Sequence, residues 1–247
     1  MFSDRLIKRM KKARSVAVLT GAGVSQESGV ATFRGEDGLW KKFKPEELAS
    51  VEAFVKNPVL VWEWYGYRQK IILKTDPNPG HMALADMEGI FPDFALITQN
   101  VDGLHRKAGS QKILELHGNI LVSRCMSCGT KSDRIEPEED GMVPRCACGG
   151  RMRPDVVWFG EMLPQDILSQ AFEAAERSDV FFSIGTSAVV HPAASLPVAA
   201  KEAGAYVVEI NPERTVLSGA LDETIIGKSG EVLPRLVSRL RESGKEA

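Results

Sequence analysis

Short apolar runs alternate with amphipathic segments along most of the chain. Six runs are rich in β-branched and other apolar residues, and some show no polar alternation: residues 15–20, 94–98, 112–116, 180–184, 206–210 and 223–226. Such runs are typical of strands buried on both faces of a parallel sheet. Amphipathic segments with helical spacing occupy about 3–13, 81–88, 164–178, 191–203 and 231–242. This alternation predicts an α/β fold built on a doubly wound parallel sheet.

Two stretches interrupt the alternation. Residues from about 40 to 80 are helical in pattern and rich in aromatic side chains, and residues from about 122 to 153 hold all four cysteines. We interpret both as insertions that form a smaller lobe, with a helical part at 39–79 and a cysteine-rich ribbon at 122–154. The large, Rossmann-like lobe then comprises residues 1–38, 80–121 and 155–247, and the two lobes form one domain over 1–247.

Charge and hydropathy exclude several classes of protein. The net charge is −2 and the pI about 6.1, so the chain has no global electrostatic reason to bind nucleic acid or an anionic membrane. No apolar stretch approaches the ~18 residues of a membrane span, and the first twenty residues lack the pattern of a secretory signal. We therefore expect a cytoplasmic protein, most simply a monomer, whose cysteines are in a reducing environment.

The cysteines form two close pairs, Cys125 with Cys128 and Cys146 with Cys148, separated by 17 residues. This spacing favours one structural Zn²⁺ held by four thiolates, which leave no open position for a reacting water. Two disulfides, or a redox or catalytic metal site, remain as alternatives. The segment between the pairs is too small to bury a core, so metal binding would supply much of its folding energy.

A glycine-rich turn follows the first predicted strand directly. Its sequence, Gly-Ala-Gly-Val-Ser at 21–25, would let the backbone approach a diphosphate at a helix start. A hydride-transferring dehydrogenase would carry a third glycine where Gln26 stands and an acid about 20 residues further on. The turn alone is equally compatible with a generic strand–helix connection. The ring of Phe33 and the guanidinium of Arg34 would suit a nicotinamide ribose and a phosphate, although a plain surface loop is also possible.

Polar side chains follow other predicted strands. Gln99, Asn100 and Asp102 come just after the second run, and His117 comes after the third. These positions lie at the carboxyl edge of the sheet, where open α/β sheets bind ligands. Histidine titrates near neutral pH, so His117 can take a proton from a hydroxyl group.

Taken in order, these pieces closely resemble the sirtuins, and the Tyr-x-x-Arg spacing of Tyr65 and Arg68 resembles most of all the branch that removes succinyl and malonyl groups. The resemblance spans nearly the whole chain. Besides the four cysteines it comprises Gly-Ala-Gly-Val-Ser (21–25), Phe-Arg-Gly (33–35), Thr-Gln-Asn-Val-Asp-Gly-Leu-His (98–105), Leu-His-Gly (116–118), Phe-Gly-Glu (159–161), Gly-Thr-Ser (185–187), Glu-Ile-Asn (209–211) and Gly-Glu-Val-Leu-Pro (230–234).

The resemblance implies an NAD-dependent protein-lysine deacylase that transfers the acyl group to ADP-ribose and releases nicotinamide. His117 would be the catalytic base, and Asn100 a second catalytic residue. The expected NAD contacts are Gly21, Ala22, Gly23, Ser25, Phe33, Arg34, Trp40, Gln99, Asn100, Asp102, Gly185, Thr186, Ser187, Asn211, Pro212, Glu213 and Ser229.

The expected acyl-lysine site comprises Tyr65, Arg68, Val157, Phe159, Gly160 and Glu161. Tyr65 and Arg68 are three residues apart and share a helix face. A buried guanidinium would be costly without a partner, and a carboxylate on the acyl group would pair with it. The alternative is an arginine that extends to solvent beside a packed tyrosine.

Three other functions use some of the same features. NAD-dependent protein ADP-ribosyl transfer would need the same NAD residues, and the sequence does not separate it from deacylation. A zinc-ribbon module for nucleic acid is disfavoured by the acidic pI. A dehydrogenase is disfavoured by Gln26.

Overall fold

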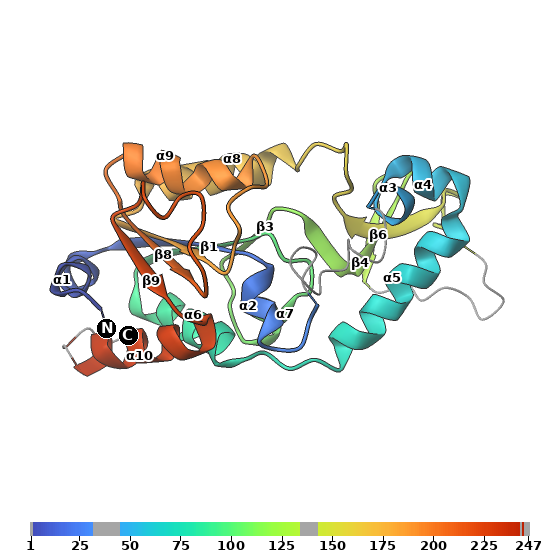
Figure 1. Ribbon diagram of the computed structural model, residues 1–247. Coiled ribbons are helices and arrows are strands. Elements are labelled where there is room, and N and C mark those ends of the chain that lie inside the picture. Colours follow the sequence, from blue (N-terminus) through green and yellow to red (C-terminus); the bar gives the residue numbers. More distant parts are fainter. Residues whose placement is uncertain (1, 32–44, 134–142, 243, 245–247) are drawn as a thin grey trace.

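The computed structural model describes residues 2–31, 45–133, 143–242 and 244 (Figure 1). Of the predicted site residues, Phe33, Arg34 and Trp40 lie outside the described part of the chain. Among the helices that the structure describes, none combines the length and the apolar character that a membrane crossing requires.

A six-stranded parallel sheet forms the larger part of the molecule, in the order β3-β2-β1-β7-β8-β9. Its strands are β1 (Ser15–Thr20), β2 (Asp93–Thr98), β3 (Ile113–Glu115), β7 (Val180–Ile184), β8 (Tyr206–Asn211) and β9 (Glu223–Ile226). All six predicted strands are present, and the Rossmann-like doubly wound sheet is confirmed. The chain turns outward in both directions from β1, so ligand-binding loops are expected beside it at the carboxyl edge.

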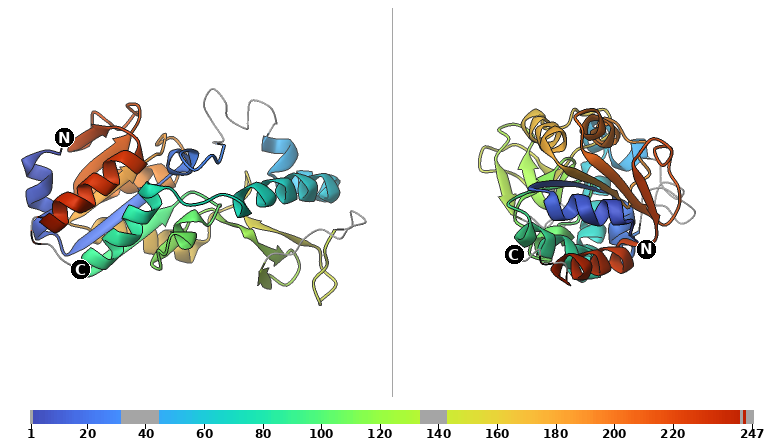
Figure 2. Two further views of the ribbon diagram at one scale, coloured as in Figure 1. Left: turned by 90° about the horizontal axis from the view of Figure 1, so that it is seen from below. Right: turned by 90° about the vertical axis from the view of Figure 1, so that its left-hand side faces the viewer.

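Helices cover both faces of this sheet (Figures 1 and 2). One face packs against α1 (Asp4–Lys12), α6 (Pro79–Ile90) and α10 (Ser229–Glu242), and the other packs against α8 (Gln165–Arg177) and α9 (Leu196–Glu202). Val18 and Phe182 belong to the first core, whereas their neighbours Leu19 and Phe181 belong to the second. Successive side chains of a strand point to opposite faces, which explains why apolar residues occupy consecutive positions in these runs.

The two insertions pack together at the other end of the molecule (Figure 1). The first forms α3 (Pro45–Leu48), α4 (Val51–Lys56) and α5 (Pro58–Leu73), and the second contributes to a three-stranded antiparallel sheet of β5 (Lys131–Asp133), β4 (Gly118–Cys125) and β6 (Met152–Val156). The sequence analysis placed no strands in the cysteine-rich segment, because its strands carry few apolar residues.

An aromatic cluster holds these insertions together. Phe54, Trp62, Tyr65 and Trp158 are all buried in one core. The indole Nε1 of Trp62 donates to the carbonyl of Met152 at 2.9 Å, and that of Trp158 donates to the Tyr65 hydroxyl at 2.8 Å. The buried rings thus combine apolar packing with satisfied polar groups, and they fix α5 against the small sheet.

Helix boundaries differ from the expected ones where prolines and caps intervene. Helix α6 begins two residues earlier than predicted, at Pro79, because Asn78 caps it: the Asn78 side chain accepts from the backbone N–H of Gly80 and His81. The segment predicted as one helix from 191 starts instead as a short 3₁₀ turn, Ala193–Ser195, and α9 follows with Pro197 in its first turn. Proline is favoured in that position because it lacks a backbone N–H.

Candidate functional site

The carboxyl ends of β2, β1 and β7 bring the glycine turn together with the predicted polar residues. The turn leads into α2 (Ala22–Gln26). Asn100 Nδ2 donates to the carbonyl of Gly21 and to Ser25 Oγ, each at 3.1 Å. Gln99 Nε2 donates to Thr186 Oγ1 at 3.0 Å. One hydrogen-bonded group of loops therefore contains residues from all three strand ends.

The two glycines of the turn have a packing role that the sequence analysis did not identify. The backbone N–H of Gly23 donates to the carbonyl of Gly185 at 2.8 Å. A Cβ atom at either Gly21 or Gly23 would lie 2.8 Å from that same oxygen, closer than carbon and oxygen can approach. Glycine is therefore required here for contact between the two loops, whether or not a phosphate also approaches.

His117 lies between β3 and β4, and its ring orientation is fixed by a backbone contact. Its Nδ1 lies 2.9 Å from the carbonyl oxygen of Gln99. A carbonyl only accepts, so Nδ1 carries the proton and Nε2 has the free lone pair of a base. Burial lowers the pKa of His117 below its ordinary value of 6.5, although the bond to Gln99 opposes this. The ring is thus neutral at pH 7 and able to accept a proton.

Gly118 fixes how the chain leaves His117. Its φ is +78°, and a Cβ atom would lie 2.0 Å from the carbonyl oxygen of Asp155. The carbonyl of His117 accepts from the backbone N–H of Val157 at 2.9 Å. The backbone of the candidate base is therefore hydrogen-bonded directly to Val157, the first residue of the predicted substrate segment.

Asp102, Arg68 and Tyr65 link the glycine-turn site to α5. Burial raises the pKa of Asp102, while hydrogen bonds from Leu104 N–H and Ser25 and the charge of Arg68 oppose the rise. Burial lowers the pKa of Arg68, and Tyr65 and Asp102 oppose that shift. Burial also raises the pKa of Tyr65 to about 12. Arg68 is 7% exposed, so the alternative in which it extends to solvent is wrong.

The predicted substrate segment combines exposed and supporting residues. Phe159 and Gly160 are exposed, and Phe159 N–H donates to the carbonyl of Ala49 at 2.9 Å. Glu161 accepts from Arg153 Nη1 at 2.6 Å and Nη2 at 2.9 Å, and from Trp158 N–H at 2.8 Å. The sequence analysis missed Arg153 because nothing in its neighbourhood marks it as buried. The Glu161 carboxylate is thus occupied in holding this segment in place.

The remaining predicted NAD residues lie along the same edge of the sheet. They differ in how far they are buried and in whether they are hydrogen-bonded to other residues. Thr186 is buried and Ser187 exposed, just after β7. Asn211 Nδ2 donates to the carbonyl of Glu213 at 2.8 Å, which closes a local turn across Pro212. Ser229 is buried, and its hydroxyl donates to the Glu27 carboxylate at 2.5 Å. Glu27 therefore ties the end of the glycine-turn helix to the start of α10.

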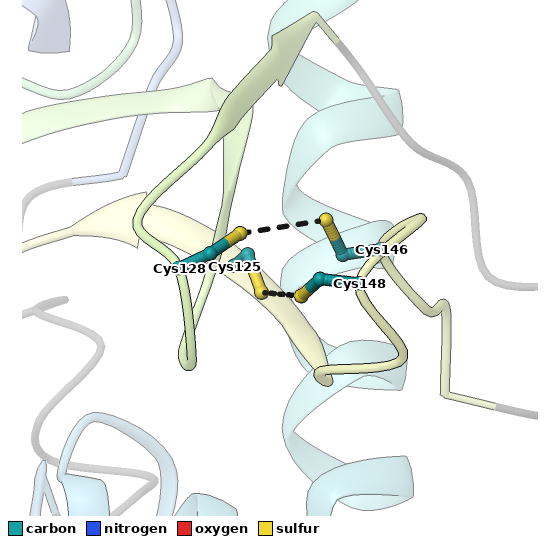
Figure 3. Close-up of side chains that lie close together, drawn as sticks. All are labelled: Cys125, Cys128, Cys146 and Cys148. Carbon is teal, nitrogen blue, oxygen red and sulfur yellow. Dashed lines mark hydrogen bonds between the residues drawn. The ribbon is translucent and has the colours of Figure 1, made fainter.

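The four cysteines converge at the far end of the small sheet (Figure 3). All four are free thiols, and their sulfur atoms all lie within 4.8 Å of one another. The Sγ atoms of Cys125 and Cys148 are 3.5 Å apart, and those of Cys128 and Cys146 are 3.7 Å apart. Four thiolates about 2.3 Å from one zinc ion would be separated by about 3.8 Å. The cluster fits one structural Zn²⁺, and the two-disulfide alternative is wrong.

Comparison with known proteins decides the family. Residues 21–192 match the Sir2 family. The chain belongs to the Sir2 family. One curated sirtuin relative, from Aquifex aeolicus (strain VF5), is named NAD-dependent protein deacylase; it is 53% identical over 229 residues, which cover 92% of this chain and 96% of the relative.

Two solved Sir2 structures show what such a fold binds. A variant Sir2 homologue in complex with 2'-O-acetyl ADP ribose has a TM-score of 0.91 and 46% identity, covering 98% of both chains. A Sir2 complex with a p53 peptide and NAD⁺ has a TM-score of 0.86 and 31% identity, covering 100% of both chains.

Proposed function

We propose that this sirtuin is an NAD-dependent protein-lysine deacylase whose acyl pocket prefers acyl groups that end in a carboxylate. The observation that carries the deacylase function is the position of His117. Its Nδ1 donates to the carbonyl of Gln99, so Nε2 is the basic atom, next to the loops that carry Asn100 and the glycine turn. The relatives named as deacylases support the same activity.

Each residue has a definite task in this reaction. NAD, when bound, supplies the ADP-ribose that receives the acyl group, and nicotinamide is released. Nε2 of His117 takes a proton from a ribose hydroxyl so that the oxygen can attack the acyl carbon. Asn100, held by Gly21 and Ser25, keeps the glycine turn in place. With one water consumed, the products are free lysine, nicotinamide and an O-acyl-ADP-ribose, in keeping with the acetyl-ADP-ribose complex of a homologue.

The acyl-lysine is expected to enter beside Val157, Phe159 and Gly160. Phe159 is 51% exposed and Gly160 is also exposed, so an extended peptide can approach this segment beside the small sheet. Pairing through backbone groups gives affinity without a strict sequence requirement. The p53-peptide complex of a Sir2 protein supports a peptide substrate of this kind. The four cysteines would hold a zinc ion with no open position for a reacting group, and the ion would support the shape of this lobe.

The preference for a terminal carboxylate depends on Tyr65 and Arg68. Both are buried on α5, and Arg68 lies close enough to Asp102 for each to shift the pKa of the other. A guanidinium in so dry a setting gains strongly from a bidentate carboxylate. The phenolic hydroxyl of Tyr65, which accepts from Trp158, still has its own proton to donate. A succinyl or malonyl group would present the matching acceptor.

One experiment tests both parts. A single peptide carrying acetyl-, malonyl- or succinyl-lysine is incubated with NAD and the wild-type protein, and nicotinamide and free lysine are measured. We expect nicotinamide release only with an acylated peptide, and Arg68→Met to reduce desuccinylation at least tenfold more than deacetylation. Lys70→Met, an exposed change on the same helix, is the control. Equal loss of both activities would refute the carboxylate preference, and nicotinamide release without an acyl peptide would refute deacylation.

A further inference from the structure

Two buried histidines lie behind the glycine turn, away from the atoms of the proposed reaction. His81 is in the first turn of α6, and His105 is in α7 (Leu104–Lys107). They are 0% and 3% exposed, and their ring centroids are 4.7 Å apart. Each ring has one nitrogen without a hydrogen-bond partner among the described residues, Nε2 of His81 and Nδ1 of His105. Unpaired polar atoms in a dry interior are costly, so this arrangement requires an explanation.

The other nitrogen of His81 shows where its proton lies. The backbone N–H of Asn78 donates to Nδ1 of His81 at 3.3 Å. Nδ1 is therefore an acceptor, and the neutral ring carries its proton on Nε2. The unpartnered atom of His81 is a hydrogen-bond donor.

The contacts of His105 indicate that its unpartnered nitrogen is a hydrogen-bond acceptor. Nε2 of His105 lies 2.9 Å from Thr20 Oγ1, and Thr20 Oγ1 donates its own proton to Thr98 Oγ1 at 2.8 Å. The Thr20 oxygen is therefore free to accept from Nε2–H of His105. The unpartnered Nδ1 of His105 is then an acceptor, opposite the donor of His81.

We propose that His81 and His105 are a matched donor and acceptor, joined directly or through one buried water, and that they act as positioning residues for Asn100 in the deacylase reaction proposed above. The joined pair completes a hydrogen-bond chain that runs in one direction. It leads from Asn78 N–H through both rings to Thr20 and Thr98, and Thr98 Oγ1 also accepts from Asn100 N–H at 3.1 Å.

Residues at both ends of this hydrogen-bond chain also contact the glycine turn and the helix that follows it. At one end, Asn78 Nδ2 donates to the carbonyl of Val24 at 2.7 Å and to Ser28 Oγ at 2.9 Å. At the other end, Asn100 Nδ2 donates to the carbonyl of Gly21. A fixed direction of hydrogen bonding thus holds both ends of α2 relative to Asn100.

Burial keeps both rings in the neutral form that the chain requires. It lowers the pKa of His81 to about 4, and, together with the nearby His81, lowers the pKa of His105 to about 3. A protonated His81 would turn Nδ1 into a donor facing the Asn78 N–H, which is also a donor, and the hydrogen bond would be lost. The neutral tautomers are therefore the ones that satisfy both the Asn78–His81 and the His105–Thr20 hydrogen bonds.

The first test reads the tautomers directly. Imidazole ¹⁵N chemical shifts of the wild-type protein, measured from pH 5.5 to 8, should show Nε2–H tautomers for His81 and His105 that do not titrate. His117 should show the opposite, Nδ1–H tautomer. A proton on Nδ1 of His105, or a His81 that titrates in this range, would overturn the proposal even if the protein had no deacylase activity.

The second test separates positioning from stability. Thr20→Val keeps the shape of the side chain but removes the hydroxyl link, and we expect kcat/KM for NAD to fall about tenfold or more. Thr20→Ser restores the hydroxyl and should recover most of this loss, and Thr75→Val, at the end of α5, is the control. His105→Gln retains a donor and an acceptor and should lose less activity than His105→Leu. Unchanged NAD kinetics in Thr20→Val, or no recovery in Thr20→Ser, would refute the positioning role.

Discussion

The salt bridge between Glu161 and Arg153 gives the sharpest test of how the small lobe holds the substrate segment. The side chain of Arg153 is 3% exposed and that of Glu161 20%. The Arg153 guanidinium also stacks on the Trp158 ring, 3.2 Å from its centroid. Solvent therefore cannot reach the Arg153 guanidinium, and only the Glu161 side of the pair is partly open to it.

The cost of breaking it follows from that burial. Removing one member of a buried ion pair leaves an uncompensated charge and costs about 3–5 kcal/mol. In Glu161→Gln the amide keeps one acceptor, so we expect the lower end, about 3 kcal/mol. For a chain of this length, each kcal/mol lowers Tm by about 2–4 °C. The expected loss is therefore about 6–12 °C.

Thermal unfolding of Glu161→Gln, followed by circular dichroism, measures this loss. The matched control is Asp76→Asn, which removes the same charge from the exposed pair with Lys107, where the carboxylate is 87% exposed. Exposed pairs contribute at most about 1 kcal/mol. The double variant Arg153→Met, Glu161→Gln should lose less stability than the sum of the two single variants. In each single variant the remaining partner is a buried charge without its counter-ion, whereas the double variant carries neither charge. The peptide KM of Glu161→Gln should also rise, since Trp158 N–H and Arg153 then compete for the single remaining oxygen acceptor.

The pH dependence has a definite sign. Burial raises the pKa of Glu161, but Arg153, Trp158 N–H and Arg124 outweigh it, and the pKa is lowered below 4.5. The stabilising charge is fully present above pH 4.5 and is lost as the pH falls through the folded-state pKa. The stability gap between wild type and Glu161→Gln should therefore narrow below pH 4.5. A gap under 2 °C at pH 7, or one that widens in acid, would refute the reasoning.

Three further variants test the site. Because burial lowers the pKa of His117, the acid limb of the pH profile of kcat/KM should lie below pH 6.5. His117→Ala should reduce turnover by about 10²–10⁴. An acid limb above pH 7 would contradict the assignment of His117 as the base. Gly23→Ala would place a Cβ 2.8 Å from the Gly185 carbonyl and should weaken NAD binding about tenfold by calorimetry, whereas Gly219→Ala, with nothing within 4 Å, should not. Cys128→Ser should lose the one bound zinc per chain, as metal analysis would show, and raise the peptide KM; full zinc retention would count against the four-thiolate site.

The sheet could be predicted because its central strands are buried on both faces. A run such as Val180–Ile184 is buried at every position and apolar at all but Ser183, and no neighbouring segment is needed to interpret it. The strands of the zinc-binding ribbon could not be predicted in this way. Lys131–Asp133 is exposed at all three positions and owes its pairing to β4, a partner that local pattern does not reveal.

The same distinction, between features set by local sequence and features set by distant partners, applies to the site. Placement of Gln99, Asn100 and Gly185 at one edge follows from the parallel direction of the strands that they follow, which the alternation of elements predicts. The partners of individual side chains do not follow, because they come from distant parts of the chain. Ser229, expected to contact NAD, donates to Glu27, 202 residues away, and Glu161, expected to contact substrate, is held by Arg153.

One strand connects the metal site to the proposed chemistry. β4 begins at Gly118, directly after His117, and ends at Cys125, a span of about 23 Å at 3.3 Å per residue. Its neighbour β6 pairs Met152 with Cys125 at the cysteine end and Val156 with Gly118 at the other, next to Val157 of the substrate segment. A zinc ion bound at Cys125 would therefore hold one end of the β4–β6 register, whose other end carries the proposed base and the proposed substrate segment. Loss of the metal should act through that register, raising the peptide KM more than the KM for NAD, since the glycine turn belongs to the other sheet.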